Sequence, residues 1–459
     1  MAKRSMARGR SSGVGASKRK ARRIAAKNLA ESGLTTDTDQ DEQTEEKEPT
    51  KEKSSRKKKV EKDLKDQLIS TVNKKQKSKS ALYTLSAEVY STITGFFSFG
   101  IPWIDKICGG GAPKGRCIEI FGWEGSGKTA LLEELIVDCM RKGGLAVLFE
   151  PETALEKHRL RQKLLEQTDL YKHIASTLEE WIEKKEKDPD LPDPLDDILY
   201  SPADTAEEIF EEIETMVDVI KKEDPDRSVI FGWDSVAATT TDTEQKTEVG
   251  KQQYSKQAII ISRALRKIRR KIADTGTTIV FLNQLRSKVN EQQARGSEDY
   301  ETFGGKAIRF YSTIRLNLKK VGKVKLKKGK EIEEESTTKA AAKRAKQKVD
   351  GLLIEAEAVK NKIFGVPPFQ RARFPIMFHE GGISPERSAL LFLTQKKMTE
   401  SAGSNGRRVL GIEDDYFTEA TWPAYYKRHA EEIEEAFFVN PADSAREEDE
   451  DEDYDEDAD

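Results

Sequence analysis

The stretch that most constrains the fold is GWEGSGKT at residues 122–129, which lies between an apolar run and a helical pattern. A glycine-rich turn of this form between a strand and a helix is typical of phosphate-binding loops. Its glycines let backbone N–H groups point at phosphate oxygens, and the following helix adds its dipole. Lys128 is expected to reach the β- and γ-phosphates, and Thr129 to offer its hydroxyl to Mg²⁺. The predicted nucleotide-contacting set here is Gly122, Trp123, Glu124, Gly125, Ser126, Gly127, Lys128, Thr129 and Ala130.

Short apolar strands alternate with amphipathic helices around this loop. The predicted strands are CIEIFG, LAVLFE, RSVIFGWD and TTIVFLNQ, and the longest helices are TAEEIFEEIETMVDVIKK and SKQAIIISRALRKIRRKIAD. Strands of this kind separated by helices favour an α/β fold with a mostly parallel central sheet. The helix after the loop carries leucines and isoleucines at helical spacing, which predicts that it packs on the sheet.

Polar side chains follow the carboxyl ends of these strands, where ligands bind in such sheets. Asp234 and the adjacent Ser235 suit a Mg²⁺-holding role, and Gln284 ends the next strand. Glu150 and Glu152 are two apart, so both carboxylates point to one side if the extended geometry persists. One of the two is expected to orient or deprotonate an attacking water.

The composition limits the classes of protein that fit. Charged residues make up 35% of the chain, and the net charge of −3 hides a basic start and an acidic end. Residues 1–60 are therefore predicted to be a disordered low-complexity arm, and residues 441–459 a disordered acidic tail. The three cysteines and four histidines form no zinc or disulfide pattern. No apolar run is long enough to span a membrane, and the start lacks the apolar core of a signal peptide, which indicates a soluble protein of a reducing compartment.

Between the two ends, four segments are expected. Residues 61–95 hold a short amphipathic helix and a linker, and residues 96–384 form the ATPase core. A lysine-rich stretch at about 319–348 is interpreted as an exposed hairpin tip or insertion in that core. Residues 385–440 are expected to form a small α+β domain that ends in a helix.

The order and spacing of several motifs resemble those of the bacterial RecA recombinases. These motifs are IEIFGWEGSGKTALLEEL, FEPETAL, WDSVAA, FLNQLRSKV, FGGKAIRFYSTIRL and AVKNKI, and the likeness runs from Leu64 to Phe438. The resemblance implies a cytoplasmic protein of a bacterium or bacteriophage that uses ATP and Mg²⁺. It also implies helical filaments on single-stranded DNA, pairing with homologous double-stranded DNA and strand exchange. Single-strand-binding and loading proteins are partners that the family uses.

Residue roles follow from the resemblance, motif by motif. Glu152 is similar to the water-activating glutamate of the family, and Gln284 to the residue that senses the γ-phosphate and relays to the DNA loops. Lys360 and Lys362 resemble the pair that reaches the ATP of the neighbouring protomer. Their spacing puts both on one face of a strand, which suits two cations directed at one phosphate.

Further positions are implied at the protomer interface and around the base. Phe310 matches an interface aromatic, and the helix at 64–77 matches the oligomerisation helix of the family. Glu156 and Phe378 fall where the family contacts adenine. Arg159 stands where the family has an adenine-stacking tyrosine, and its guanidinium is also able to stack on a base.

Two loops of the family hold DNA, and here they correspond to residues 239–256 and 287–305. The second loop is polar and has no apolar periodicity, which is typical of a loop that orders only when DNA binds. The chain departs from the family at Ile259, Phe303 and Lys306. Candidate DNA contacts are Arg263, Arg266, Arg286, Lys288, Gly304, Gly305 and Lys306.

Two other readings of the same residues stay open. A hexameric helicase or motor shares the P-loop core, although such proteins usually act with an arginine in trans. A DNA-coating protein that binds ATP only for assembly is the second alternative. The intact set of Lys128, Thr129, Asp234 and Glu152 favours hydrolysis.

Overall fold

The computed structural model describes residues 64–75, 82, 93–152, 156–246, 254–287, 300–327, 330–334, 349–378, 382–402, 406–412 and 415–438. The expected arm at 1–60, the tail at 441–459 and the lysine-rich stretch from 335 to 348 lie outside these residues. A helix at 64–75 belongs to a first unit, Met1–Ala87, and Leu64 and Leu68 are exposed on it. All labelled elements belong to the second unit, Glu88–Asp459.

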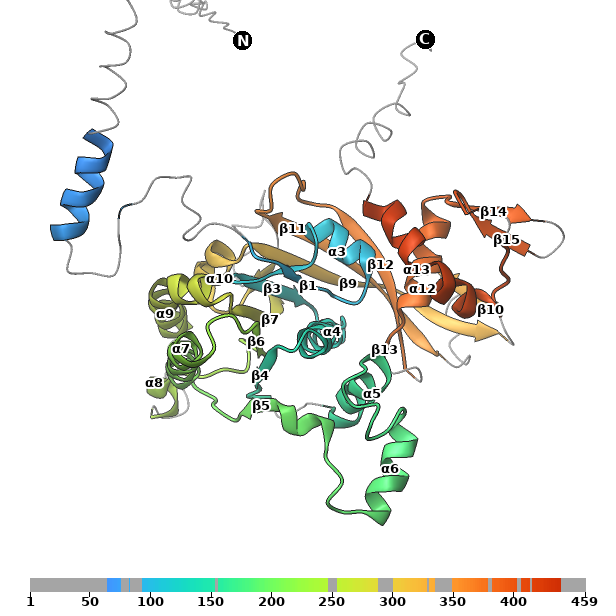
Figure 1. Ribbon diagram of the computed structural model, residues 1–459, viewed down its shortest axis with the longest axis horizontal. Coiled ribbons are helices and arrows are strands. Elements are labelled where there is room, and N and C mark those ends of the chain that lie inside the picture. The colour runs from blue at the N-terminus through green and yellow to red at the C-terminus, as the bar shows by residue number, and fades with distance from the viewer. Residues whose placement is uncertain are drawn as a thin grey trace, which may run out of the picture. The chain divides into compact units, whose positions relative to one another are not determined.

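The second unit alternates strands and helices through most of its length (Figure 1). In chain order the elements are β1 (Phe96–Phe97), α3 (Pro102–Cys108), β2 (Ala112–Pro113), β3 (Cys117–Gly122), α4 (Lys128–Arg141), β4 (Leu145–Phe149), α5 (Lys157–Gln167), α6 (Leu178–Lys187), the 3₁₀ helix η1 (Pro194–Asp197), β5 (Ile198–Ser201), α7 (Ala206–Glu223), β6 (Val229–Trp233), α8 (Asp242–Gln245), α9 (Tyr254–Thr275), β7 (Thr278–Ser287), β8 (Tyr300–Thr302), α10 (Gly305–Tyr311), β9 (Ile314–Lys327), β10 (Lys330–Glu334), β11 (Gly351–Asn361), β12 (Arg371–Met377), β13 (Gly382–Ile383), α12 (Pro385–Gln395), β14 (Thr399–Ala402), β15 (Gly406–Val409) and α13 (Trp422–Phe438).

One large sheet organises the second unit, with the strand order β13-β12-β11-β9-β3-β7-β6-β4-β5. Neighbouring strands from β9 to β5 are parallel. Those from β9 to β13 are antiparallel, and β8 and β10 add short antiparallel pairs to β7 and β9. The predicted α/β fold with a mostly parallel central sheet is therefore confirmed.

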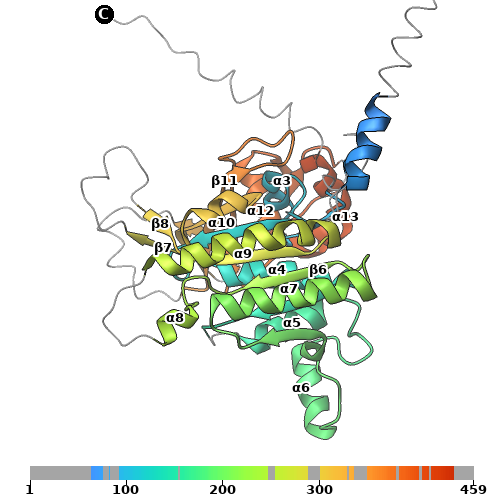
Figure 2. The same ribbon diagram turned by 90° about the vertical axis from the view of Figure 1, so that its left-hand side faces the viewer.

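The two faces of this sheet carry different helices because side chains alternate along each strand. In β7, Val280 and Leu282 belong to the cluster around α4, whereas Ile279 and Phe281 belong to the cluster with α7 and α9. Helices α7 and α9 lie side by side over one face in Figure 2, with α10 next to α9. The helix that follows the glycine-rich turn thus lies on the opposite face of the sheet from α7 and α9.

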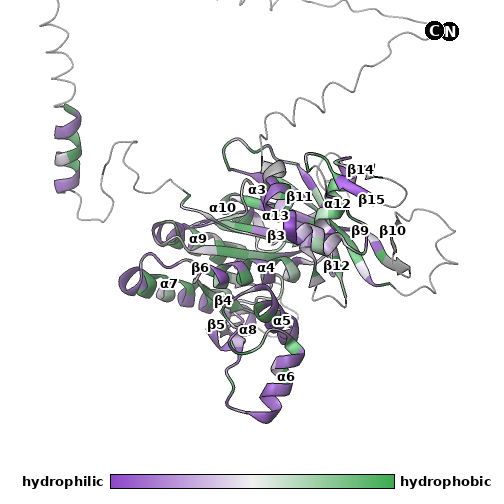
Figure 3. Ribbon diagram, turned by 45° about the vertical axis from the view of Figure 1, so that its right-hand side comes forward, coloured by the Kyte–Doolittle hydropathy of each residue, from purple (hydrophilic) through white to green (hydrophobic). Residues whose placement is uncertain are grey.

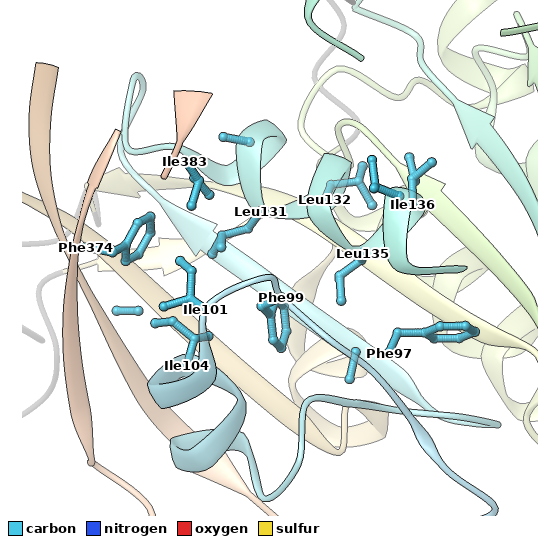
Figure 4. Packing of buried hydrophobic residues seen from close by; sticks show 14 of the residues in the cluster. Phe97, Phe99, Ile101, Ile104, Leu131, Leu132, Leu135, Ile136, Phe374 and Ile383 are labelled. Carbon is cyan, nitrogen blue, oxygen red and sulfur yellow. The ribbon is translucent and has the colours of Figure 1, made fainter. Parts of the chain in front are cut away.

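The layer around α4 also holds the start and the end of the second unit. Phe97, Phe99 and Ile104 pack beneath Leu135 and its neighbours (Figure 4). Buried residues of the expected C-terminal domain, such as Tyr425, belong to the same cluster. Residues 385–438 therefore share one hydrophobic core with the sheet.

Two regions differ from the expected arrangement. The lysine-rich stretch starts inside the sheet, because β9 continues to Lys327 and pairs with β11 as far as Val324. Sequence periodicity also gave no element between 157 and 197, where α5, α6 and η1 lie. No helix among the described ranges is long and apolar enough to cross a membrane.

Helix α6 and η1 form a small projection with contacts of its own (Figures 1 and 3). The helix is mostly hydrophilic, but Trp181 is buried and its Nε1 donates to the carbonyl oxygen of Pro192 at 3.1 Å. The guanidinium of Arg161 lies 4.4 Å from the Trp181 ring and forms a bidentate ion pair with Asp193. These contacts hold the projection to α5.

Candidate nucleotide-binding site

The glycine-rich turn joins β3 to α4 at the carboxyl edge of the parallel strands. Gly127 is the N-cap of α4 and has φ 87°, which is the left-handed region that favours glycine. A Cβ atom at Gly127 would also clash with the side chain of Ile376 in β12. The backbone conformation therefore favours glycine at this position, and a larger residue would also have to displace the end of the Ile376 side chain.

The inside of the turn has polar groups without external partners. Nζ of Lys128 donates to the carbonyl oxygens of Gly122 at 3.3 Å and Trp123 at 3.1 Å. The hydroxyl of Ser126 is buried and has no hydrogen-bond partner in the described structure. Because a buried hydroxyl without a partner is costly, an anion that accepts from Ser126 and Lys128 would fit this turn.

Thr129 and Asp234 meet beside the turn. The hydroxyl of Thr129 donates to Oδ2 of Asp234 at 2.8 Å. Burial raises the pKa of Asp234 to about 6, and the charges of Glu152 and Glu150 add to this effect, whereas Thr129 and Lys128 oppose it. A hydroxyl and a carboxylate are the hard oxygen ligands that Mg²⁺ takes in phosphate sites. No group of three His, Cys, Asp or Glu side chains forms a metal cluster in the described ranges, so Mg²⁺ would also need oxygens of phosphates or water.

Two side chains from neighbouring strands of the sheet meet the carboxylate of Glu152. The hydroxyl of Ser235, after β6, donates to its Oε1, and Nε2 of Gln284, in β7, donates to the same oxygen at 3.3 Å. Glu152 is otherwise exposed in a turn after β4. An exposed carboxylate held by two neutral donors is free to accept a proton from a water molecule beside the phosphate turn.

Glu150 has a different environment, and the extended geometry on which the expected common direction of the two carboxylates depended does not persist. β4 ends at Phe149, and Pro151 and Glu152 form a turn, so the strand alternation stops before the pair. Glu150 is only 4% exposed, and the hydroxyl of Tyr200 in β5 donates to it. The two glutamates are thus directed to different neighbours.

The residues expected around the base lie near the ends of α5 and β12. Glu156 is the exposed N-cap of α5, and Phe378 is exposed directly after β12. Nε and Nη2 of Arg159 donate to the buried carboxylate of Glu133 in α4 at 2.6–2.9 Å. Arg159 also lies against β13, because a Cβ on Gly382 would be 3.6 Å from its Cδ.

Lys360 and Lys362 lie at the end of β11, and they contact α10 rather than the phosphate turn. Both donate to the carbonyl oxygen of Phe310, at 3.1 and 3.3 Å. Burial lowers the pKa of Lys360 to about 8, and the charges of Lys362 and Arg315 lower it further. Phe310 is 68% exposed, and Nζ of Lys362 lies 5.7 Å from its ring. The lysines and the aromatic ring together form one exposed group.

The candidate DNA contacts are spread over α9, β7 and α10. Arg263 and Arg266 are exposed on α9, and Lys306 is exposed on α10. Arg286 forms an ion pair with Glu301 at 2.8 Å, and its guanidinium lies 4.9 Å from the ring of Phe303. The remaining candidates are two glycines, Gly304 with φ 77° as the N-cap of α10 and Gly305 with φ 70°, and Lys288, which lies outside the described residues.

The two expected DNA loops hold more regular structure than their sequences indicate. β7 continues to Ser287, and its last residues pair with β8, so the second loop begins and ends as an antiparallel hairpin. α8 and the start of α9 lie within the first loop. The strands were missed because the polar residues there have no alternating pattern.

Three buried polar side chains beside the site were also missed. Glu119, Asn283 and Arg315 lie in β3, β7 and β9 and are at most 7% exposed. The signal was the presence of a charged or amide side chain inside a strand that is otherwise apolar.

Comparisons with known proteins agree with this arrangement. The family described as RecA N-terminal domain matches residues 62–180 and 190–384. Protein RecA of Campylobacter hominis is 33% identical over 272 residues, which cover 59% of this chain and 62% of that protein. Protein RecA of Helicobacter pylori strain Shi470 is 31% identical, over 64% of this chain and 68% of that protein. Protein RecA of Legionella pneumophila strain Corby is 30% identical, over 70% of this chain and 74% of that protein. On these matches the chain belongs to the RecA family.

Proposed function

We propose that this protein is an ATP-dependent recombinase that forms helical filaments on single-stranded DNA and exchanges strands with homologous double-stranded DNA. The observation that carries the proposal is the meeting of Ser235 and Gln284 on one oxygen of Glu152, beside Lys128 and Thr129. A phosphate turn, a base and a polar sensor at one sheet edge are the parts of a nucleotide hydrolase. Family membership extends the proposal to DNA.

In this proposal each side chain of the site has a defined task. Nζ of Lys128 leaves the carbonyl oxygens of the turn and binds the phosphates of ATP, together with the buried hydroxyl of Ser126. Thr129 and Asp234 hold Mg²⁺, which neutralises charge on the phosphates when bound. Glu152 takes the proton of the attacking water. Arg159, Phe378 and Glu156 border the adenine base.

Assembly would use the group formed by Phe310, Lys360 and Lys362. An exposed aromatic ring beside two cations fits a neighbouring protomer with bound ATP better than it fits solvent. The helix at 64–75, with exposed Leu64 and Leu68, is proposed to pack on the neighbour as well. ATP would then lie between protomers and link hydrolysis to the filament.

DNA would be bound by the two loop segments at 239–256 and 287–305 and by α9. Arg263 and Arg266 on α9 and Lys306 on α10 are exposed cations, and they suit contacts to phosphates. Because such contacts release counterions, binding should weaken steeply with salt. We further propose that the protein works in the cytoplasm with single-strand-binding and loading proteins.

Strand exchange with homologous and heterologous duplex tests the proposal directly. The wild-type protein should exchange only the homologous duplex, with ATP and Mg²⁺, and should hydrolyse ATP faster when single-stranded DNA is added. The Lys128→Ala variant is the matched control, because it should keep the fold and lose the contact between Lys128 and the phosphates. Closed rings with unwinding activity in electron micrographs would point to a helicase, and a lack of hydrolysis would point to a DNA-coating protein.

A further inference from the structure

Asn283 in β7 is fully buried, and all four hydrogen-bonding positions of its side-chain amide are used. Its Oδ1 accepts from the backbone N–H of Gln284 at 2.9 Å and of Phe303 at 3.2 Å. Its Nδ2 donates to the carbonyl oxygen of Phe303 at 2.9 Å and to Oε1 of Glu119 at 3.0 Å. The reversed orientation of the amide would place hydrogens against two N–H groups, so the bonds fix its orientation.

The two bonds to Phe303 continue the ladder of the β7–β8 hairpin. Leu285 pairs with Thr302, and β8 has no partner residue for Asn283 itself. The side chain of Asn283 therefore closes the base of the hairpin, where the chain enters α10 through Gly304. A movement of β8 has to break these bonds or move the side chain of Asn283 with it, because Phe303 is bound at both its N–H and its C=O.

A buried ion pair holds the amide from the other side. Oε2 of Glu119 accepts from Nε of Arg315 at 2.5 Å, and the guanidinium lies 4.5 Å from the ring of Phe121. These residues lie on the adjacent strands β9 and β3, on the same face as Asn283. The ion pair holds Glu119 in place, because separating the pair would leave a buried charge without compensation. Glu119 in turn restrains the amide of Asn283 through Oε1.

The network has functional groups at both ends. On β7 it holds the backbone of Gln284, whose side chain donates to Glu152. On β9 it ends at Arg315, which is opposite Lys360 of β11 in the sheet register. The buried row Asn283–Glu119–Arg315 thus crosses from the hydrolysis site towards the lysines that we place at the protomer interface.

We infer that Asn283 is a positioning residue that couples the placement of Gln284 to the paired strands β7 and β8, with Glu119 and Arg315 as its anchor. The inference rests on the proposed function, in which Gln284 contacts the phosphate and this hairpin binds DNA. DNA that pulls or fixes the hairpin would then set the position of Gln284 and Glu152. Neither Asn283 nor its anchor touches the nucleotide in this scheme.

A pair of substitutions that moves one negative charge from residue 119 to residue 283 separates this coupling role from a purely structural one. Asn283→Asp puts a second carboxylate beside Glu119 and removes both donors of the amide. Glu119→Gln restores one donor, so the double variant has the total charge of the wild type. Asn317→Ala is the control, because Asn317 lies on β9 two residues from Arg315 and its Oδ1 has no hydrogen bond in the described structure.

The readouts are ATP hydrolysis with and without single-stranded DNA, and affinity for a fluorescent ATP analogue. Asn283→Asp should lose stimulation by DNA by about tenfold or more, which is the usual size of coupling between two sites. Its affinity and basal hydrolysis should stay within about threefold of the wild type, since the phosphate turn is untouched. The double variant should recover most of the stimulation, and Asn317→Ala should match the wild type.

Three results would overturn the inference. If Asn283→Asp keeps its stimulation, or if affinity, basal hydrolysis and stimulation all fall together with the melting temperature, the residue is structural. If the wild type itself shows no stimulation by DNA, the proposed function fails first and the inference with it. Should circular dichroism show that Asn283→Asp is unfolded, Asn283→Ser, which adds no charge, carries the same expectation and the same refutation.

Discussion

Replacing Glu152 by glutamine should separate hydrolysis from nucleotide binding. The amide still accepts from Ser235 and Gln284 through its oxygen, so the turn after β4 should keep its position. It no longer takes a proton, and the loss of a general base costs ~10²–10⁴ in rate. At 1.36 kcal/mol per tenfold, the barrier rises by about 3–5 kcal/mol. Affinity for ATP should change by less than about threefold, because in the described structure no hydrogen bond joins Glu152 to the phosphate turn.

Glu150→Gln is the matched comparison, because it makes the same chemical change two residues away. Its carboxylate is buried and accepts from the hydroxyl of Tyr200, so it is less able to take a proton from a water molecule and turnover should fall by less than about tenfold. Single-turnover hydrolysis and analogue binding of both variants, with circular dichroism as a folding check, measure the difference. Near-normal turnover in Glu152→Gln together with a collapse in Glu150→Gln would show that the wrong carboxylate was assigned as the base.

Three other predictions concern stability and assembly. Burial raises the pKa of Asp105 from 3.8 to about 7, so this group favours the folded state below pH 3.8 and loses that contribution as the pH rises through 7. Asp105→Asn should therefore raise the free energy of unfolding at pH 8 by up to about 4 kcal/mol, and an equal effect in urea melts at pH 5 would contradict this. The carboxylates of Asp415 and Glu432 raise the pKa of His429, so the drop in melting temperature caused by His429→Gln should shrink from pH 6 to pH 9; a constant drop would refute the ion pairs. Phe310→Ala should leave the melting temperature of the monomer unchanged and weaken filament assembly by about 30-fold in light scattering, and unchanged assembly would remove Phe310 from the interface.

The parts of the site that follow a strong local pattern could be predicted from the sequence. The phosphate turn, the strands and helices around it, and Asp234 at the end of β6 follow from short-range rules for glycine turns and alternating apolar segments. Lys360 lies in β11 and Lys362 directly after it, so strand alternation applies only to the first of them, although both donate to the same carbonyl oxygen.

Features that depend on contacts between distant segments could not be predicted. The direction of Glu150 depends on where β4 ends, and only Tyr200 on the next strand reveals its partner. β8 is three residues long and forms only because β7 extends to receive it. The buried polar residues Glu119, Asn283 and Arg315 are far apart in the chain. The sheet register that brings them together cannot be read from the sequence of any one strand.

The projection formed by α6 and η1 shows where this chain tolerates a change of length. The family match skips residues 181–189, which run from Trp181 through the end of α6. Trp181 closes the projection on its own residues and on Arg161, so its base is fixed while its tip at 188–190 is exposed. Segments whose base is closed in this way accept insertions without loss of the sheet edge. A fluorescent label or an affinity tag placed at this tip would report on assembly while the phosphate turn stays untouched.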